Sequence, residues 1–102
     1  MKKSLLSFIL ISNLFLFAET LELYKNCAGC HGEKGELSAL QKSKLIGGQE
    51  KNLTIKQLIA YKNGELDQYG LGGIMKLQLS SLSESDIDSL AEYIANLDIN
   101  AS

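Results

Sequence analysis

Two cysteines and one histidine stand close together in the segment Cys27-Ala28-Gly29-Cys30-His31, and the chain has no other cysteine or histidine. Two thiols at this spacing can reach two vinyl groups on adjacent edges of one porphyrin, and the histidine that follows is then placed over the metal. This pattern of cysteines and histidine is the attachment signature of c-type haem. The sequence therefore predicts one covalently bound haem c, with thioether bonds at Cys27 and Cys30 and with the haem iron bound by His31.

Three other kinds of site also use a cysteine pair at this spacing. A redox dithiol of the thioredoxin type is expected beside a βαβ pattern, and the sequence shows no such pattern. A zinc site needs four ligands, so a carboxylate would have to join Cys27, Cys30 and His31. A disulfide between Cys27 and Cys30 would close a very short loop and would stabilise the fold little. We therefore favour haem attachment.

Met75 is the candidate for the second axial ligand that a low-spin electron-transfer haem requires. It is the only methionine besides Met1, and it lies in the segment Gly72-Gly73-Ile74-Met75-Lys76. Glycines in this segment let the backbone approach a flat ligand closely. The alternative is that Met75 only fills space in the core, as methionine often does. Since no second histidine competes for the iron, we expect Met75 to complete the axial pair.

Residues 1–18 have the features of a secretory signal peptide. Lys2-Lys3 gives a positive start, residues 5–17 are mostly apolar, and the small residue Ala18 precedes the first acidic residue. The apolar run is short for a membrane span. We expect cleavage of this segment and export to the periplasm, which leaves residues 19–102 as one domain.

The composition fits one small globular domain. Of the 102 residues, 45% are apolar and 22% are charged, and the formal net charge is −2. The chain has no arginine, and this argues against a nucleic-acid partner, because phosphate contacts depend on basic side chains. A domain of this size buries little apolar surface on its own, so we expect a bound cofactor to stabilise it.

About three helices are predicted. Thr20 can cap the first helix, and the glycines on either side of His31 make a long continuation unfavourable. Thr54 and Gln57 form a capping-box pattern at the start of the second helix. That helix is expected to stop at Asn63-Gly64, a pair suited to a left-handed helix end.

The last helix is the clearest of the three. Ser83 can cap it, and acidic residues follow in its first turn. Its apolar residues recur at helical spacing and define one face: Ile87, Leu90, Ala91 and Ile94. Residues 32–49 and 65–82 are predicted to be mostly loop, and no strand alternation is present. The predicted fold is all-α, with loops long enough to need a large flat cofactor to order them.

These residues make the sequence similar to the small class I cytochromes c of the bacterial periplasm. The resemblance covers nearly all of residues 19–102. Besides the motif with the two cysteines, it rests on Leu23-Tyr24, Lys44-Leu45-Ile46-Gly47, Gly73 with Met75, Leu82-Ser83 and Tyr93-Ile94. It implies a cytochrome c-like fold of three to five helices around one haem, in which the first and last helices cross.

The resemblance also implies roles for individual residues. Tyr24 and Tyr93 are expected near the crossing of the two helices, and Leu45 is expected to pack against the haem. Many relatives have a proline two residues before that leucine, and its carbonyl accepts a hydrogen bond from the haem-binding histidine. Here the position is Ser43, whose carbonyl can accept the same bond without the rigidity of proline.

The function that follows is electron transfer and not enzymatic catalysis. We expect a soluble periplasmic monomer that carries single electrons between a donor and an acceptor redox protein and docks transiently, including to membrane redox complexes. A peroxidase-like enzyme would need distal acid–base groups, and no second histidine or arginine is available. Four lysines could ring the exposed haem edge and steer an acidic partner, although they could equally be ordinary solvated lysines: Lys34, Lys42, Lys44 and Lys76.

Two alternatives stay open. A haem-based sensor or gas-binding protein needs an empty or weakly held sixth position on the iron, so the role of Met75 separates it from an electron carrier. A haem subunit of a membrane-anchored redox complex would keep residues 1–18 as an uncleaved anchor.

Overall fold

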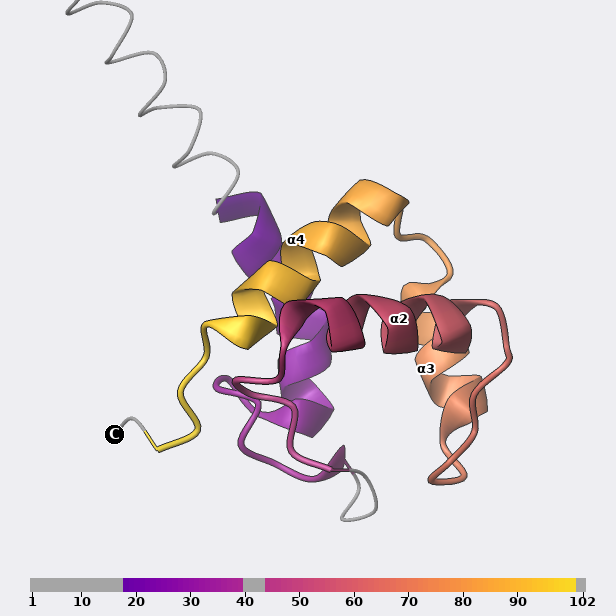
Figure 1. The fold of residues 1–102 in the computed structure, drawn as a ribbon, viewed down its shortest axis with the longest axis horizontal. Coiled ribbons are helices and arrows are strands. Elements are labelled where there is room, and N and C mark those ends of the chain that lie inside the picture. The colour runs from indigo at the N-terminus through magenta and orange to yellow at the C-terminus, as the bar shows by residue number, and fades with distance from the viewer. Residues whose placement is uncertain (1–17, 40–43, 101–102) are drawn as a thin grey trace, which may run out of the picture.

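The computed structural model describes residues 18–39 and 44–100, and these residues form helices and loops without a strand. Residues 18–31 form the N-terminal helix. It is followed by α2 (Lys51–Lys62), α3 (Gly72–Leu79) and α4 (Glu84–Ala95), as Figure 1 shows. The predicted all-α fold is confirmed. Residues 1–17, in which most of the predicted signal peptide falls, lie outside the described residues.

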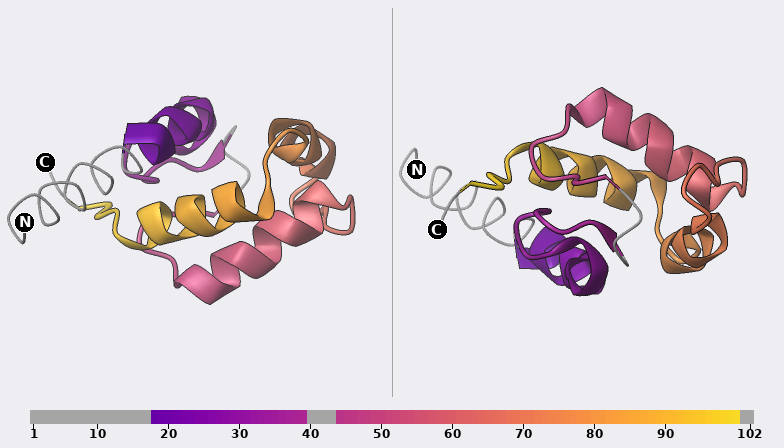
Figure 2. Two further views of the ribbon diagram at one scale, coloured as in Figure 1. Left: turned by 90° about the horizontal axis from the view of Figure 1, so that it is seen from above. Right: turned by 90° about the horizontal axis from the view of Figure 1, so that it is seen from below.

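Helix α4 provides the centre of the core, because it lies between the N-terminal helix and α2 (Figure 2). The Ser83 hydroxyl accepts a hydrogen bond from the Asp86 N–H at 3.1 Å, and the Asp86 carboxylate accepts one from the Ser83 N–H at 3.0 Å. This reciprocal pair is a capping box, as the sequence predicts. The predicted apolar face is buried and at most 3% exposed: Ile87, Leu90, Ala91 and Ile94.

The N-terminal helix meets α4 through two tyrosines. The ring centroids of Tyr24 and Tyr93 are 5.1 Å apart, and the rings are tilted by 43°. Tyr24 is 3% exposed and belongs to the same core cluster as Leu90. The expectation that the first and last helices cross near these two tyrosines is confirmed. Gly32 follows the helix with φ +86°, a conformation that is costly for any residue other than glycine.

The second helix begins earlier than predicted, and the prediction of Thr54 as its N-cap is wrong. Glu50 is the N-cap, and its carboxylate accepts hydrogen bonds from the N–H groups of Asn52 at 3.0 Å and Leu53 at 2.9 Å. A carboxylate at this position satisfies two free donors and interacts favourably with the helix dipole. Thr54 therefore lies inside the first turn, where it is buried. The predicted end of the helix is confirmed, since Asn63 is the C-cap and the next residue is a left-handed glycine.

The predicted loop over residues 65–82 is wrong for its second half, because Gly72–Leu79 forms α3. Two adjacent glycines lower the helix propensity of the segment, so the good helix formers that follow them are not recognised as a helix from the sequence. In the structure the glycines occupy the first turn, and the Asp67 carboxylate accepts a hydrogen bond from the Gly72 N–H at 2.7 Å. Met75 therefore lies on a helix and not in a loop.

Backbone hydrogen bonds tie the loop after the N-terminal helix to the segment before α2. The Gly35 carbonyl accepts hydrogen bonds from the N–H groups of Ile46 at 3.1 Å and Gly47 at 3.0 Å. The Gly48 N–H donates to the Ile94 carbonyl of α4 at 2.8 Å. These bonds hold both loops against the helical core. Within residues 18–39 and 44–100, no helix is both long and apolar enough to cross a membrane.

Candidate functional site

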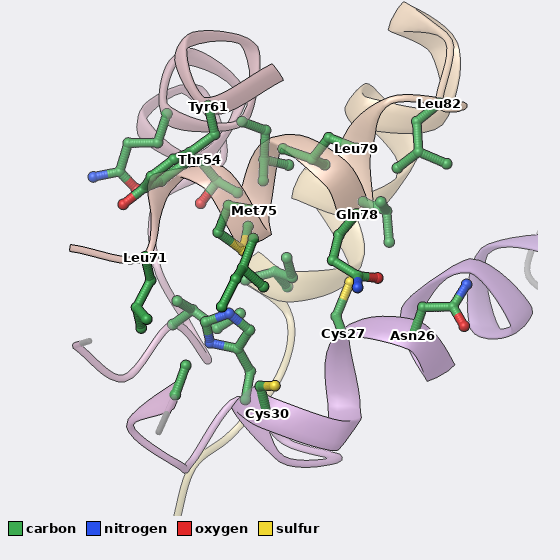
Figure 3. A pocket seen from close by; sticks show the side chains of 18 of the residues that line it. Asn26, Cys27, Cys30, Thr54, Tyr61, Leu71, Met75, Gln78, Leu79 and Leu82 are labelled. Atoms are coloured by element: carbon green, nitrogen blue, oxygen red, sulfur yellow. The ribbon is translucent and has the colours of Figure 1, made fainter. Parts of the chain in front are cut away.

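A cavity of about 260 Å³ opens among the four helices, and the residues predicted to bind haem lie in its wall. Cys27, Cys30 and His31 reach the cavity from the N-terminal helix, and Met75 reaches it from α3. Figure 3 shows Met75 across the cavity from the two cysteines. Apolar side chains from all four helices complete the wall, among them Leu23, Leu58, Leu79 and Leu90.

The two cysteines occupy the last turns of the N-terminal helix and differ in exposure. Cys27 is partly buried against the core cluster, whereas Cys30 is exposed. Both thiols are free. Burial, with a smaller contribution from neighbouring Cys30, raises the pKa of Cys27 to about 11, so this thiol is protonated near neutral pH. Two free thiols three residues apart on a helix point to the same side of it, and here both line the cavity.

His31 is the last residue of the helix and is 8% exposed. Burial lowers the pKa of its imidazole, which favours the neutral form that binds metals. Its Nδ1 atom is buried and has no hydrogen-bond partner among the described residues. The carbonyl of Ser43, which is expected to accept a hydrogen bond from this ring, lies outside the described residues. That contact therefore stays a prediction.

Tyr24 holds the chain just beyond the imidazole. Its hydroxyl donates a hydrogen bond to the Gly32 carbonyl at 2.7 Å. Burial, followed by smaller effects that include the Cys27 thiol, raises the pKa of Tyr24 well above its usual value, so the phenol stays protonated and able to donate. The His31 carbonyl accepts a hydrogen bond from the Leu37 N–H at 2.9 Å. The end of the helix is thus fixed from the core, through a contact that the sequence does not predict.

The expected packing of Leu45 against the haem stays a prediction. The Leu45 side chain is 45% exposed and is not among the residues that line the cavity, whereas Lys44 and Ile46 on either side of it are. The segment named by the resemblance does reach the cavity wall. In this structure Ile46, and not Leu45, supplies the apolar side chain of the segment to the cavity.

A polar cluster in the cavity wall is not predicted from the sequence. Gln49 Nε2 donates hydrogen bonds to Thr54 Oγ1 at 2.8 Å and to Gln57 Oε1 at 2.7 Å. Thr54 is 4% exposed, and Figure 3 shows it on the opposite side of the cavity from Cys27. The Gln57 amide and the Thr54 hydroxyl still have hydrogens to donate. Thr54 and Gln57 suggest only a capping box in the sequence, so no local pattern reveals the cluster.

The lysines expected around the haem edge lie in different surroundings. Lys44 lines the cavity, and Lys76 is exposed on α3 next to Met75. Lys34 is half-buried, and Lys42 lies outside the described residues. The ring of lysines therefore stays a prediction. Across the described ranges, no three or more histidine, cysteine, aspartate or glutamate side chains converge on a possible ion site, so the zinc alternative gains no support.

The residues of the cavity fit a haem c. Two free thiols on one helix can form the two thioethers, a buried imidazole lines the cavity beside them, and a thioether sulfur enters from another helix. The apolar wall suits the porphyrin face, and the polar cluster with Gln49 offers donors to carboxylates.

Comparison with known proteins gives the same assignment. The family model for cytochrome c matches residues 17–98. Cytochrome c-553 of Helicobacter pylori is 34% identical over 99 residues, which cover 95% of this chain and 99% of the relative. Cytochrome c-553 of Nitratidesulfovibrio vulgaris is 30% identical over 84 residues, 78% of each chain. Cytochrome c-554(547) of Halothiobacillus neapolitanus is 37% identical over 79 residues, 71% of this chain and 85% of the relative. The chain belongs to the cytochrome c family, as a small class I haem electron carrier with one covalently attached haem c.

Proposed function

We propose that this cytochrome transfers single electrons with His31 and Met75 as the axial ligands of the haem iron and with Cys27 and Cys30 as its attachment points. The observation that carries the proposal is the convergence of these four side chains on one cavity from two different helices. Nothing local in the sequence requires Met75 to meet the other three residues, so their meeting supports a shared role.

The bound haem supplies a reversible one-electron couple between Fe(III) and Fe(II). The chain keeps the surroundings of that couple constant. An iron-bound imidazole is neutral, a form that burial of His31 already favours by lowering the pKa of the ring. Met75 is uncharged as well, so neither ligand needs to exchange a proton when an electron arrives. Ligands that stay in place in both oxidation states keep the structural rearrangement small, and a pair of histidine and methionine raises the reduction potential.

The polar cluster would hold the haem at the end away from Cys27. Haem has two carboxylates, and burying them is costly unless they are hydrogen-bonded. The Gln57 amide and the Thr54 hydroxyl have donors available, and Lys44 can add a positive charge from the cavity wall. Gln49 orients the other two side chains through its two hydrogen bonds.

The proposal includes export. Residues 1–18 would direct the chain to the periplasm and be removed there. The mature protein would act as a soluble monomer that docks transiently to a donor and an acceptor redox protein, with Lys44 and Lys76 among the charges that steer the encounter. Mass spectrometry of the exported protein should find a chain that begins at Glu19. A membrane-bound chain that keeps residues 1–18 would favour a haem subunit of an anchored redox complex.

Binding of carbon monoxide to the reduced protein tests the axial pair. We expect the wild-type protein to bind carbon monoxide poorly, because Met75 occupies the sixth position, and the Met75→Ala variant to bind it readily while its haem stays attached. The matched control is Leu77→Ala, which truncates a side chain of the same helix that is 72% exposed and does not line the cavity, and it should leave carbon monoxide binding as weak as in the wild type. Ready binding by the wild type would contradict the proposal and favour a haem-based sensor or gas-binding protein.

A further inference from the structure

Helix α3, which carries Met75, is short and buries little of its surface. It spans 8 residues, of which only Gly72 and Leu79 are buried. Leu77 is 72% exposed and does not line the cavity. A helix of this length is not stable on its own, because nucleation is costly and few hydrogen bonds follow it. The position of Met75 therefore depends on the packing of α3 against α2 and on contacts that fix the ends of α3.

Asp67 makes such a contact at the start of the helix. The N-cap residue Leu71 forms no side-chain hydrogen bond to the helix. Instead, Asp67 Oδ1 accepts a hydrogen bond from the Gly72 N–H at 2.7 Å. The Asp67 carbonyl also accepts one from the Gly70 N–H at 3.2 Å. One residue therefore closes the turn before α3 and binds the first N–H group of the helix.

The fit between this turn and the helix start is close. A Cβ atom at Gly72 would lie 2.9 Å from Asp67 Oδ1 and would collide with the Leu66 carbonyl, whereas a Cβ at Gly73 would meet nothing within 4 Å. The Met75 N–H donates to the Leu71 carbonyl at 3.1 Å. A short series of contacts thus runs from the Asp67 carboxylate through the start of α3 to Met75.

The other two helix starts for which caps are described differ in what surrounds them. Glu50 caps α2, and Ser83 with Asp86 caps α4. Helix α4 also buries four residues in the core, so its position does not depend on its cap alone. Asp86 is therefore a matched control for Asp67, since both carboxylates accept a hydrogen bond from a backbone N–H at a helix start.

We propose that Asp67 is a positioning residue for the sixth axial ligand: its carboxylate fixes the start of α3 and thereby the reach of Met75 into the cavity. This inference rests on the proposed ligand role of Met75. Without the carboxylate, α3 frays or shifts at its start, and Met75 leaves the iron while the haem and the core stay in place. Loss of a helix-start hydrogen bond changes such an equilibrium roughly 2- to 30-fold.

The test measures two properties of the holoprotein: the apparent affinity of the reduced form for carbon monoxide, and the weak far-red band of methionine–iron ligation in the oxidised form. Asp67→Ala should bind carbon monoxide roughly 2- to 30-fold more tightly than the wild type and should lose the far-red band at a lower temperature. Asp67→Asn keeps an oxygen acceptor and should recover most of the wild-type behaviour. Asp86→Ala should lower the unfolding temperature but leave the affinity for carbon monoxide unchanged.

A second pair of variants tests the same contact with Asp67 intact. Gly72→Ala forces the Asp67 carboxylate and the Leu66 carbonyl away from the helix start, so it should raise the affinity for carbon monoxide in the same direction as Asp67→Ala. Gly73→Ala adds the same methyl group one residue later, where there is open space. Because alanine also raises the helix propensity of α3, this variant should not raise the affinity for carbon monoxide.

The outcomes separate this inference from the proposed function. If Met75→Ala binds carbon monoxide readily but Asp67→Ala and Gly72→Ala behave like the wild type, the role of Asp67 is overturned and the ligand role of Met75 stands. An equal rise in Asp86→Ala and Asp67→Ala would also overturn it, because general loss of stability would then explain both. A wild-type protein without the far-red band overturns the ligand role of Met75 and this inference with it.

Discussion

His31 and Met75 line the same cavity from two helices that are held in different ways. His31 is 8% exposed and ends a helix whose Tyr24 is 3% exposed and hydrogen-bonded to the Gly32 carbonyl. Met75 is partly buried on α3, a helix of 8 residues on which Leu77 is 72% exposed. Elements with few buried apolar contacts open locally at a lower free energy than core elements. The comparison teaches that, of the two proposed iron ligands, His31 is anchored in the core, whereas Met75 depends on a short helix whose start is fixed by Asp67.

Removing a cysteine from the N-terminal helix, which also carries His31, has the largest expected effect. In Cys27→Ala only Cys30 can form a thioether, so we expect little holoprotein, with a single covalent bond in whatever forms. Haem staining after denaturing electrophoresis and the spectrum of the pyridine complex count the thioethers. Gly29→Ala is the control, because a Cβ at Gly29 meets nothing within 4 Å, and it should mature normally. Full attachment through two bonds in Cys27→Ala would contradict the assignment.

A pair of apolar truncations compares the core with α3 directly. Ile87 is 1% exposed and does not line the cavity, so Ile87→Ala should lower the free energy of unfolding by about 2–5 kcal/mol through lost burial and a new cavity. Leu77→Ala removes a side chain that is 72% exposed and should change it by no more than about 0.5 kcal/mol. Denaturant unfolding of both holoproteins measures the difference. Equal losses would show that α3 is packed as firmly as the core.

Tyr24→Phe tests the hydrogen bond that fixes the chain next to His31, and it has the smallest expected effect on stability of the changes to this side of the cavity. It removes the hydrogen bond to the Gly32 carbonyl but keeps the ring contact with Tyr93. The Gly32 carbonyl still accepts from the Gly35 N–H at 3.1 Å, so we expect a loss of only about 0.5–1.5 kcal/mol in unfolding free energy. The far-red band should persist up to the unfolding transition. Early loss of the band would contradict this expectation, because it would mean that the support of His31 and the position of Met75 are coupled.

The features that the sequence predicts correctly are set by neighbouring residues. The Cys-x-x-Cys-His pattern predicts a covalently attached haem c without knowledge of the fold, and membership of the cytochrome c family confirms this cofactor. Ser83 and Asp86 form a cap within four residues, and the apolar spacing of α4 gives its buried face. Local patterns are reliable here because the tertiary structure agrees with them.

The features that the sequence misses depend on contacts between segments. Helix α3 starts at two glycines of low helix propensity, and its start is stabilised by Asp67 from the preceding turn. Thr54 and Gln57 match a capping pattern in the sequence, but Glu50 caps the helix four residues earlier. Packing, and not spacing along the chain, also decides that Ile46 faces the cavity while Leu45 does not. The same holds for the polar cluster of Gln49, Thr54 and Gln57.

The most direct test of the central claim, that His31 and Met75 hold one covalently attached haem, is the absorption spectrum of the exported wild-type protein in both oxidation states. We predict sharp α and β bands of low-spin c-type haem after reduction and the weak far-red band of methionine–iron ligation after oxidation. A haem spectrum without the far-red band would contradict the role of Met75, and a protein without haem absorbance would contradict the whole account.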